Sequence, residues 1–334
     1  MADEALCTLQ TIPGLTVRPG APLRDYTRFR LGGPCLALAA TAEQNAYTQS
    51  LAVLARSGTT WTTIGAGTNL IVNDAGYPGI VLKYDAARLS AEGSTITVDA
   101  GAELNALVDF ANAHSLAGLE AMAGIPGWVG AAIYGNAGAY GQSISERISS
   151  VRFTDGNSIR QFGNPECEFR YRESIFKKNK NWQILSACLR LEPGDSAVLQ
   201  AKSAAIRAQR DAKFPPSMQC AGSIFKNLLL RELPPEIAAE VPAAVIREGK
   251  IPAGWFLEQV GAKGLRRNGI HVAEYHANLI YNAGGGTTAD LVALLSELKQ
   301  RVADRFGLLI EEEVQFLGFS ETGRPTDISS LSRI

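Results

Sequence analysis

The segment GAGTNL, residues 65–70, carries the first residues in this chain whose types and spacing could do chemistry. It follows an expected strand at WTTI, and glycines on both sides of Ala66 would let main-chain N–H groups gather round a phosphate. Thr68 and Asn69 would add side-chain donors. The third glycine of the dinucleotide fingerprint and the Gly-Lys-Ser/Thr of a Walker loop are missing, which disfavours both of those sites. A plain tight turn is the alternative interpretation.

A second segment of this kind is GIPGWVGAAIYGNAGAYG, residues 124–141. Its first proline fixes φ in a turn, and Gly130 with the two alanines after it would leave a helical turn bare. A flat ring or a pyrophosphate could then lie against the main chain, with Asn136 and the small residues after it supplying further amides. A closely packed helix and turn is the alternative. Two such loops favour one extended nucleotide, and we expect a bulky residue at Gly138 to expel it before unfolding the chain.

The elements that must position these loops follow from apolar periodicity and turn signals. The segment 103–114 has apolar residues at helical spacing, and ISSVRFTDGNSIRQF has a DGN turn between alternating arms, which predicts a hairpin. Asp195 is expected to cap a helix. The expected strands include 61–64, 79–84, 94–102, 182–193 and 311–319, and the expected helices are 103–114, 196–213 and 288–306.

Composition bounds the class of protein. A chain of 334 residues exceeds one hydrophobic core, so two or three domains are expected. The net charge of −1 and the 46% hydrophobic content exclude nucleic acid as the main partner. No signal peptide or membrane span is recognised, five scattered cysteines fit reduced thiols, and three histidines make a metal site improbable. We expect a cytoplasmic enzyme without membrane insertion, metal or protein partner.

Five motifs then occur in a definite order along the chain. They are GIPGWVGAAIYGNAGAYG, YRESIFK at 171–177, AGSIFKN at 221–227, AGWFLEQ at 253–259 and EEEVQF at 311–316. In this order they closely resemble the UDP-N-acetylenolpyruvoylglucosamine reductase (UDP-N-acetylmuramate dehydrogenase) family of peptidoglycan precursor synthesis. The resemblance covers roughly residues 24–319.

The resemblance implies an α+β fold. Two subdomains, 1–84 and 85–205, would form an FAD-binding fold of the vanillyl-alcohol oxidase (PCMH) type, 206–320 an α/β UDP-sugar domain, and 321–334 a polar tail. It implies non-covalent FAD, since His114 is the one histidine in the FAD half and lies in a helical pattern. The cofactor-binding residues it implies are Gly65, Ala66, Gly67, Thr68, Asn69, Leu70, Gly124, Ile125, Pro126, Gly127, Gly130, Ala131, Asn136, Ala137, Gly138 and Ala139.

The resemblance also implies a reaction. NADPH would reduce FAD, and UDP-N-acetylglucosamine enolpyruvate would then be reduced to UDP-N-acetylmuramate. Attack on the terminal enol carbon pushes charge toward the carboxylate, so catalysis needs an electrophilic clamp and a proton source. Arg172, Ser223 and Glu313 match the family's three catalytic positions.

Each of the three residues also has an ordinary structural interpretation. Arg172 offers a permanently charged fork for a carboxylate, and the alternative is a surface ion pair. Ser223 would donate the proton, but a serine after Gly222 commonly caps a turn. Glu313 would share a proton with the carboxylate that it faces. We expect Glu311 or Glu312 to be a solvated acidic edge.

The substrate-binding residues implied by the family are Tyr171, Lys213, Asn227 and Gln259. One branch of the family has a tyrosine-bearing loop over the substrate, but no tyrosine lies between Leu191 and Lys213, so this chain resembles the branch without it. Ala131 also stands where many members have glycine. Two other functions remain as alternatives: another FAD-dependent oxidoreductase of the same fold, or a non-catalytic flavin-binding protein.

Overall fold

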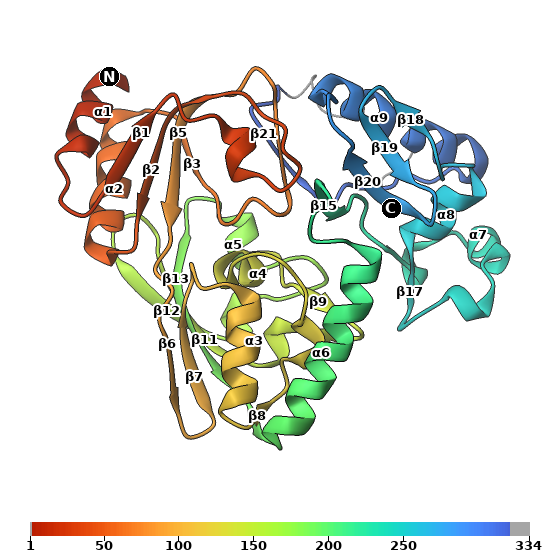
Figure 1. The fold of residues 1–334 in the computed structure, drawn as a ribbon, viewed down its shortest axis with the longest axis horizontal. Coiled ribbons are helices and arrows are strands. Elements are labelled where there is room, and N and C mark those ends of the chain that lie inside the picture. Colours follow the sequence, from red (N-terminus) through yellow and green to blue (C-terminus); the bar gives the residue numbers. More distant parts are fainter. Residues whose placement is uncertain (1, 321–334) are drawn as a thin grey trace. The chain divides into compact units, whose positions relative to one another are not determined.

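The computed structural model describes residues 2–320, so the predicted polar tail lies outside the described residues. The chain divides into two compact units (Figure 1). Within the described residues, the first unit comprises 2–21, 35–66 and 78–216, and the second comprises 22–34, 67–77 and 217–320. The boundary between two of these stretches falls inside GAGTNL, after Ala66.

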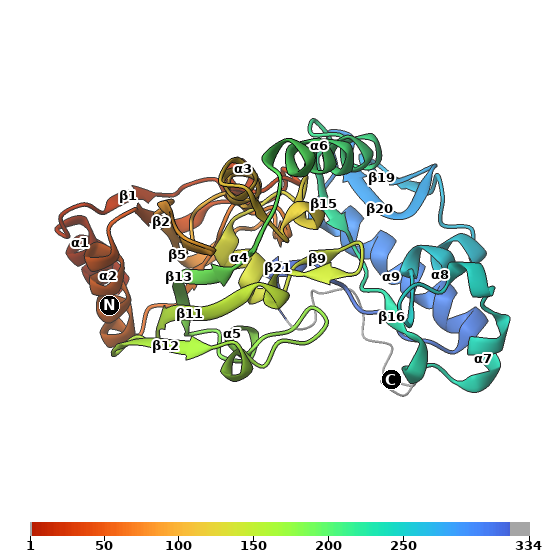
Figure 2. The same cartoon turned by 90° about the horizontal axis from the view of Figure 1, so that it is seen from below.

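The first unit holds two larger sheets and six helices of the described chain. One sheet has the strand order β1-β2-β5-β3, and the other, antiparallel, has the order β12-β11-β13-β7-β6. Figure 2 shows β12, β11 and β13 of the second of these sheets side by side. Its helices are α1 (Ala2–Gln10), α2 (Gln44–Ser57), α3 (Leu104–Ala113), α4 (Val129–Tyr134), α5 (Ile175–Lys178) and α6 (Ser196–Lys213). Its strands are β1 (Thr16–Pro19), β2 (Cys35–Thr41), β3 (Trp61–Thr63), β5 (Tyr77–Tyr84), β6 (Leu89–Glu92), β7 (Thr95–Asp99), β8 (Leu116–Ala117), β9 (Gly138–Ala139), β10 (Gln142–Ser143), β11 (Ile148–Thr154), β12 (Ile159–Gly163), β13 (Gln183–Arg190) and β14 (Glu192–Pro193).

Helices α3 and α6 lie side by side in the first unit (Figure 1). Helix α3 buries the four apolar residues whose spacing predicted it, Leu104, Leu107, Val108 and Ala111. Inside the contact, Asn112 donates to Ser203 Oγ at 2.9 Å, and both residues are buried. As expected, Asp195 caps α6, accepting from Val198 N at 3.0 Å.

The predicted hairpin is the pair β11 and β12, whose register sets Thr154 opposite Ile159. Asp155 holds the turn, because one carboxylate oxygen accepts from Asn157 N at 3.0 Å and Ser158 N at 2.9 Å. A local side-chain bond of this kind is the reason that aspartate favours turns.

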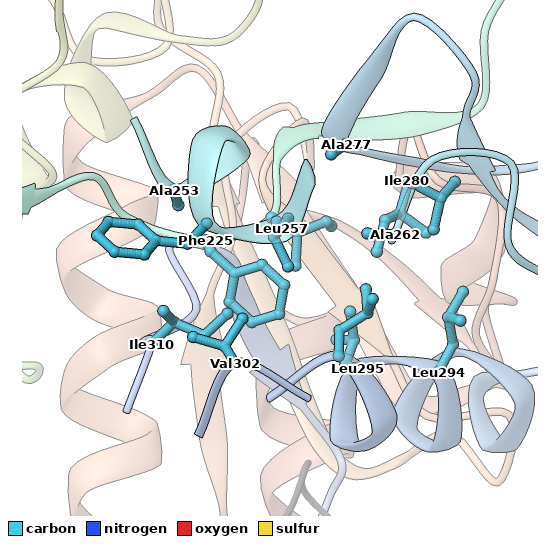
Figure 3. Packing of buried hydrophobic residues seen from close by; sticks show 14 of the residues in the cluster. Phe225, Ala253, Leu257, Ala262, Ala277, Ile280, Leu294, Leu295, Val302 and Ile310 are labelled. Carbon is cyan, nitrogen blue, oxygen red and sulfur yellow. The ribbon is translucent and has the colours of Figure 1, made fainter. Parts of the chain in front are cut away.

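The second unit is built on the antiparallel sheet β15-β20-β19-β18, against which α8 and α9 pack. Figure 3 shows the core between them, where Phe225, Leu257, Ile280 and Leu295 are fully buried. Its helices are α7 (Pro235–Glu240), α8 (Ala253–Gln259) and α9 (Thr288–Phe306). Its strands are β4 (Leu70–Val72), β15 (Cys220–Ser223), β16 (Leu228–Leu229), β17 (Lys250–Ile251), β18 (Arg266–Arg267), β19 (Ile270–Ala273), β20 (His276–Asn282) and β21 (Gln315–Leu317).

The strand expected at 311–319 is shorter than predicted, because β21 covers only Gln315–Leu317 and pairs in parallel with β4. The segment that leads into β21 changes its hydrogen-bonding partner along its length. Glu311 O accepts from Lys226 N at 2.9 Å, whereas Gln315 N donates to Asn69 O at 2.9 Å. No single ladder runs through the segment, so it does not form one continuous strand.

No helix within residues 2–320 combines the length and the apolar character that crossing a membrane would require. All five cysteines, which lie within this range, are free thiols.

Candidate active site

Within the first unit, the start of GAGTNL lies beside residues 124–141, which we call the Gly/Ala-rich segment. A Cβ built on Gly65 would lie 3.6 Å from Ala131 Cβ and 3.7 Å from the Trp128 ring. Ala131 and Pro126 are exposed, and Gly127 and Gly130 are half-buried. Small side chains and open main chain therefore border the surface where these two segments meet, and such a surface can receive a flat ring or a diphosphate.

A lysine side chain lies against the same tryptophan. The Lys83 ammonium, on β5, lies 4.5 Å from the centroid of the Trp128 ring. Burial disfavours the charged form and lowers the pKa of Lys83, although Asp85 opposes the shift. This lysine, which sequence reasoning did not single out, adds positive charge next to the Trp128 ring, which itself borders Gly65.

Two of the predicted cofactor glycines also serve packing within the protein. A Cβ on Gly130 would lie 2.9 Å from Ala100 Cβ, and one on Gly138 would lie 2.6 Å from Gln142 O, across the β9–β10 hairpin. The bulk of a larger residue at Gly138 would therefore meet main chain, which favours a disturbance of the hairpin over the expected loss of the cofactor alone. The choice between ligand contact and close packing has no single answer for this segment.

The YRES motif forms a tight turn in the first unit. Arg170 N donates to Glu173 O at 3.0 Å and Glu173 N to Arg170 O at 3.1 Å, with Tyr171 and Arg172 at the tip. The Arg172 guanidinium donates to Gly138 O at 3.3 Å and lies over the Tyr171 ring, 5.2 Å from its centroid. Asn136, which is buried, donates to Arg170 O at 2.9 Å. The turn is thus tied to the Gly/Ala-rich segment by side chains from both.

In the second unit, the residues that follow Ser223 meet the segment of Glu313. Glu313 N donates to Ile224 O at 2.7 Å, one residue after Ser223. Gly222 has a φ of 77°, and the pairing of β15 with β20 is irregular between Cys220 and Ser223. The glycine therefore turns the chain immediately before Ser223 in a way that other residues adopt with strain.

The buried side chain of Asn278 fixes this region by acting as a substitute peptide. It accepts from Phe225 N and donates to Phe225 O, both at 2.8 Å. Buried polar groups paired in this manner specify one arrangement of the chain. Asn278 carries no motif signal, and sequence reasoning missed it.

The three consecutive glutamates have different environments. Glu311 is exposed and pairs with Lys226 at 2.9 Å, so it is the solvated acidic residue that we expected. Glu312 pairs at 3.0 Å with Lys299 of α9, whose side chain is only 4% exposed. Glu313, half-buried, follows these two ion pairs.

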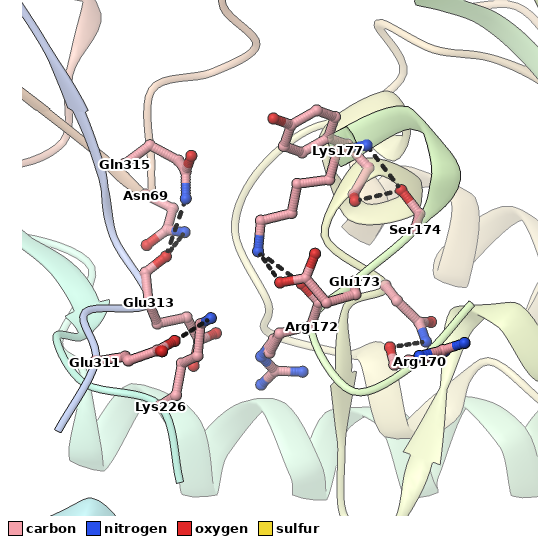
Figure 4. A network of polar contacts seen from close by, with 12 residues as sticks. Asn69, Arg170, Arg172, Glu173, Ser174, Lys177, Lys226, Glu311, Glu313 and Gln315 are labelled. Atoms are coloured by element: carbon pink, nitrogen blue, oxygen red, sulfur yellow. Dashed lines mark hydrogen bonds and ion pairs between the residues drawn. The ribbon is translucent and has the colours of Figure 1, made fainter. Parts of the chain in front are cut away.

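The side chain of the exposed residue Asn69 is bonded to a distant part of the same chain (Figure 4). Its Nδ2 donates to Glu313 O at 3.1 Å, and its main-chain oxygen accepts from Gln315 N. The amide predicted to serve a phosphate is therefore engaged by the Glu313 main chain. The side-chain role was not predicted, because a partner so distant in sequence leaves no local signal.

The predicted substrate residues lie in both units. Tyr171 and Lys213 belong to the first, where the Lys213 ammonium is 5.3 Å from the Phe214 ring centroid. In the second, Asn227 Oδ1 accepts from Ala253 N at 3.3 Å, and Gln259 is the last residue of α8. Asn227 thus contacts the first residue of α8, and Gln259 is at the other end of the same short helix.

The remaining predicted cofactor residues are placed as follows. Ala66, Gly124, Ile125, Ala137 and Ala139 belong to the first unit, and Gly67, Thr68 and Leu70 to the second. Gly67 is buried, and a Cβ on it would collide with Tyr26 O.

Comparisons with known proteins define the class. A family model described as an FAD binding domain matches residues 35–159, and one described as the C-terminal domain of UDP-N-acetylenolpyruvoylglucosamine reductase matches residues 214–317. The chain is an FAD-dependent oxidoreductase with an α+β FAD-binding fold and a C-terminal domain, which confirms the expected fold class.

Relatives identify the family. A UDP-N-acetylenolpyruvoylglucosamine reductase from Solibacter usitatus is 56% identical over 93% of this chain and 99% of its own length. The Bacillus subtilis protein of the same name is 33% identical over 89% and 92%. A crystal structure of the Thermus caldophilus enzyme, 26% identical, covers 91% of this chain and 98% of its own, with a TM-score of 0.68. The chain belongs to the UDP-N-acetylenolpyruvoylglucosamine reductase family, as the motifs predicted.

Proposed function

We propose that the protein uses NADPH and non-covalently bound FAD to reduce UDP-N-acetylglucosamine enolpyruvate to UDP-N-acetylmuramate. The family supports this reaction, and the observation that carries it is the bond from Glu313 N to Ile224 O. That bond keeps a hydroxyl and a carboxylate on adjoining segments of the second unit. In this proposal, residues 1–84 and 85–205 serve the cofactor and 206–320 the UDP-sugar.

The first unit fits FAD at the surface where Gly65 adjoins Trp128 and Ala131. Exposed small residues there would let a ring system approach the main chain, and Lys83 supplies a cation beside the Trp128 ring. When bound, FAD would supply the hydride that the enolpyruvyl group accepts. The residues that we propose to hold it are those named above at 65–70, 124–127, 130–131 and 136–139.

Arg172 would bind the carboxylate of the enolpyruvyl group. Its guanidinium is permanently charged and planar, so it can donate two parallel hydrogen bonds to a carboxylate. As hydride reaches the terminal carbon, negative charge spreads onto the neighbouring carbon and the carboxylate, and the guanidinium would stabilise that charge.

Ser223 would give its hydroxyl proton to the carbon that becomes carbanionic, which completes the addition of a hydride and a proton across the double bond. Glu313 would hold a shared proton against the substrate carboxylate, since two anions cannot face each other without one. Tyr171, Lys213, Asn227 and Gln259 would bind the UDP-sugar, and the lysine offers a cation to its diphosphate.

Replacement of Ser223 by Ala tests the proposal by separating two half-reactions. Under anaerobic conditions, NADPH should bleach the flavin of the Ser223→Ala variant at the wild-type rate. Reoxidation by the enolpyruvyl substrate should fall by ~10²-fold or more, the usual range for loss of a proton-transfer group. Stopped-flow absorbance of the flavin measures both rates.

Ser149→Ala is the matched control, because Ser149 is an exposed serine on β11. It should leave both rates unchanged. If wild-type reduced enzyme is not reoxidised by the substrate, the proposed reaction is wrong. If Ser223→Ala slows both half-reactions equally, the reaction can stand but Ser223 is not its proton donor.

A further inference from the structure

The backbone of Arg172 is in an uncommon conformation. Its φ is 57°, in the left-handed region that arginine seldom adopts. The residue is at the tip of the turn that closes between Arg170 and Glu173. Strained residues of this kind persist only where their surroundings hold them, and they gather at functional sites.

Lys177 is the side chain that holds this conformation directly. Its ammonium donates to Arg172 O at 2.8 Å and pairs with Glu173 Oε1 at 2.7 Å (Figure 4). The lysine side chain is 18% exposed, so solvent screens these charge-assisted bonds only in part. It therefore fastens the carbonyl of the strained residue and the side chain of the next residue at once.

The short helix that carries Lys177 is itself held in place. Lys177 is on the short helix α5, which Ser174 caps by accepting from Lys177 N at 3.3 Å. Ser174 is fully buried, and its hydroxyl donates to Tyr134 O at 2.7 Å, at the end of α4. The ammonium is thus held relative to the same Gly/Ala-rich segment to which the Arg172 guanidinium is bonded through Gly138 O.

We propose that Lys177 is a positioning residue for Arg172, and that it aims the guanidinium by holding the carbonyl of Arg172 in the left-handed conformation. This inference rests on the proposed function, in which Arg172 binds the carboxylate of the enolpyruvyl group. Lys177 acts on the reaction through Arg172 and does not itself contact the substrate. A change in the direction of the turn would move the guanidinium by about an ångström, a displacement that can cost ~10²-fold in rate.

The test replaces Lys177 by Met, which keeps the length of the side chain and removes its charge. Lys177→Met should slow reoxidation of the reduced flavin by the enolpyruvyl substrate ~10- to 100-fold. Reduction of the flavin by NADPH should stay within about twofold of wild type, because that step does not use the substrate carboxylate. Stopped-flow absorbance measures the two rates, and flavin content with a thermal melt shows that the variant is folded.

Lys178→Met is the matched control. Lys178 is the next residue of α5, its side chain is 49% exposed, and it pairs with Glu168 rather than with the turn. The variant should keep both rates. Glu173→Gln separates the two contacts of Lys177, since it removes the ion pair and leaves the bond to Arg172 O. It should lose less than Lys177→Met.

A double-mutant cycle with Arg172→Lys distinguishes positioning from general structural damage. If Lys177 acts through Arg172, adding Lys177→Met to Arg172→Lys should cost less than about threefold more, because the group being aimed is already gone. The inference would be overturned if the rate losses of Lys177→Met and Arg172→Lys multiplied in the double variant. It would also be overturned if Lys177→Met slowed both half-reactions equally. Full reoxidation in Arg172→Lys would instead remove the proposed role of Arg172. Impaired Arg172→Lys with unimpaired Lys177→Met would refute the role of Lys177 alone.

Discussion

At the scale of single residues, the role that a charged side chain can play in this protein depends on the ion pairs that it already forms. Three glutamates in a row look equivalent in the sequence, and only the family motif singled out Glu313. The structure supplies a physical distinction, because Glu311 is paired with Lys226 at the surface and Glu312 with Lys299 in the interior. These partners come from sequence positions far from the glutamates, so local pattern could not reveal them.

The Lys299–Glu312 pair leads to a prediction on stability. Lys299→Met should lower the free energy of unfolding by about 3 kcal/mol, because it leaves a poorly exposed carboxylate without its ammonium partner. Urea denaturation followed by circular dichroism measures the loss. Lys299→Met combined with Glu312→Gln should recover most of it, since the Glu312 charge is then removed as well.

Lys226→Met is the control for this prediction. The Glu311 side chain is 64% exposed, so breaking that pair should cost at most about 1 kcal/mol. Equal losses from the Lys226 and Lys299 variants would mean that burial does not set the energy of these pairs.

At the scale of elements, sequence reasoning worked best where the signals are local. Helix α9 has the residue range expected from its apolar stripe, and Thr287 with Asp290 forms the capping box that begins it. Helix α6 likewise begins at the aspartate cap that predicted it. The strand predicted at 311–319 was too long, because the segment before β21 changes its hydrogen-bonding partner and such a change leaves no periodic signal in the sequence.

The Gly/Ala-rich segment shows the same limit, since composition cannot tell which small residues face protein and which face a ligand. We predict that Ala131→Phe weakens FAD binding at least ~10-fold, because Ala131 is exposed beside Gly65 and a phenyl ring would fill the proposed cofactor surface. Fluorescence titration of apoprotein with FAD measures the dissociation constant. The melting temperature of the apoprotein should be unchanged.

Gly138→Ala should behave in the opposite way. Its Cβ would lie 2.6 Å from Gln142 O, so the hairpin must shift at a cost of roughly 1–3 kcal/mol in apoprotein stability. Ala131→Ser serves as the small-residue control and should bind FAD normally. Normal FAD affinity in Ala131→Phe would show that the cofactor does not lie on this face of α4.

At the scale of the whole molecule, motif order across the chain predicted more than any element did. Five short motifs sufficed to predict the family, the fold class and the FAD-binding domain, which the comparisons then confirmed. The contacts that hold the motif residues in place could not be predicted from the sequence. Asn69 with Glu313 and Lys177 with Arg172 depend on folded geometry, the first across a long stretch of chain and the second on a turn whose left-handed residue is not a glycine.

Buried thiols give the whole chain a further property, a loss of stability in alkali. Burial raises the pKa of Cys167 from its ordinary 9.0 to about 12 and that of Cys35 to about 11. Well below pH 9 both thiols are protonated in folded and unfolded chains alike, so their contribution is fully present. As the pH rises from 9 toward 12, the unfolded chain releases protons that the folded chain retains, and the free energy of unfolding falls.

We therefore predict that Cys167→Ala flattens the alkaline decline of stability. A single thiol contributes up to ~1.4 kcal/mol per pH unit while its unfolded form is ionised and its folded form is not. Urea denaturation at pH 9, 10 and 11 should give a slope against pH that is shallower by about this amount in Cys167→Ala than in wild type. The comparison uses slopes, so a constant loss from the smaller side chain does not affect it. Cys7→Ala, at an exposed cysteine, should follow the wild-type slope, and parallel lines for all three proteins would show that the Cys167 thiol ionises equally in both states.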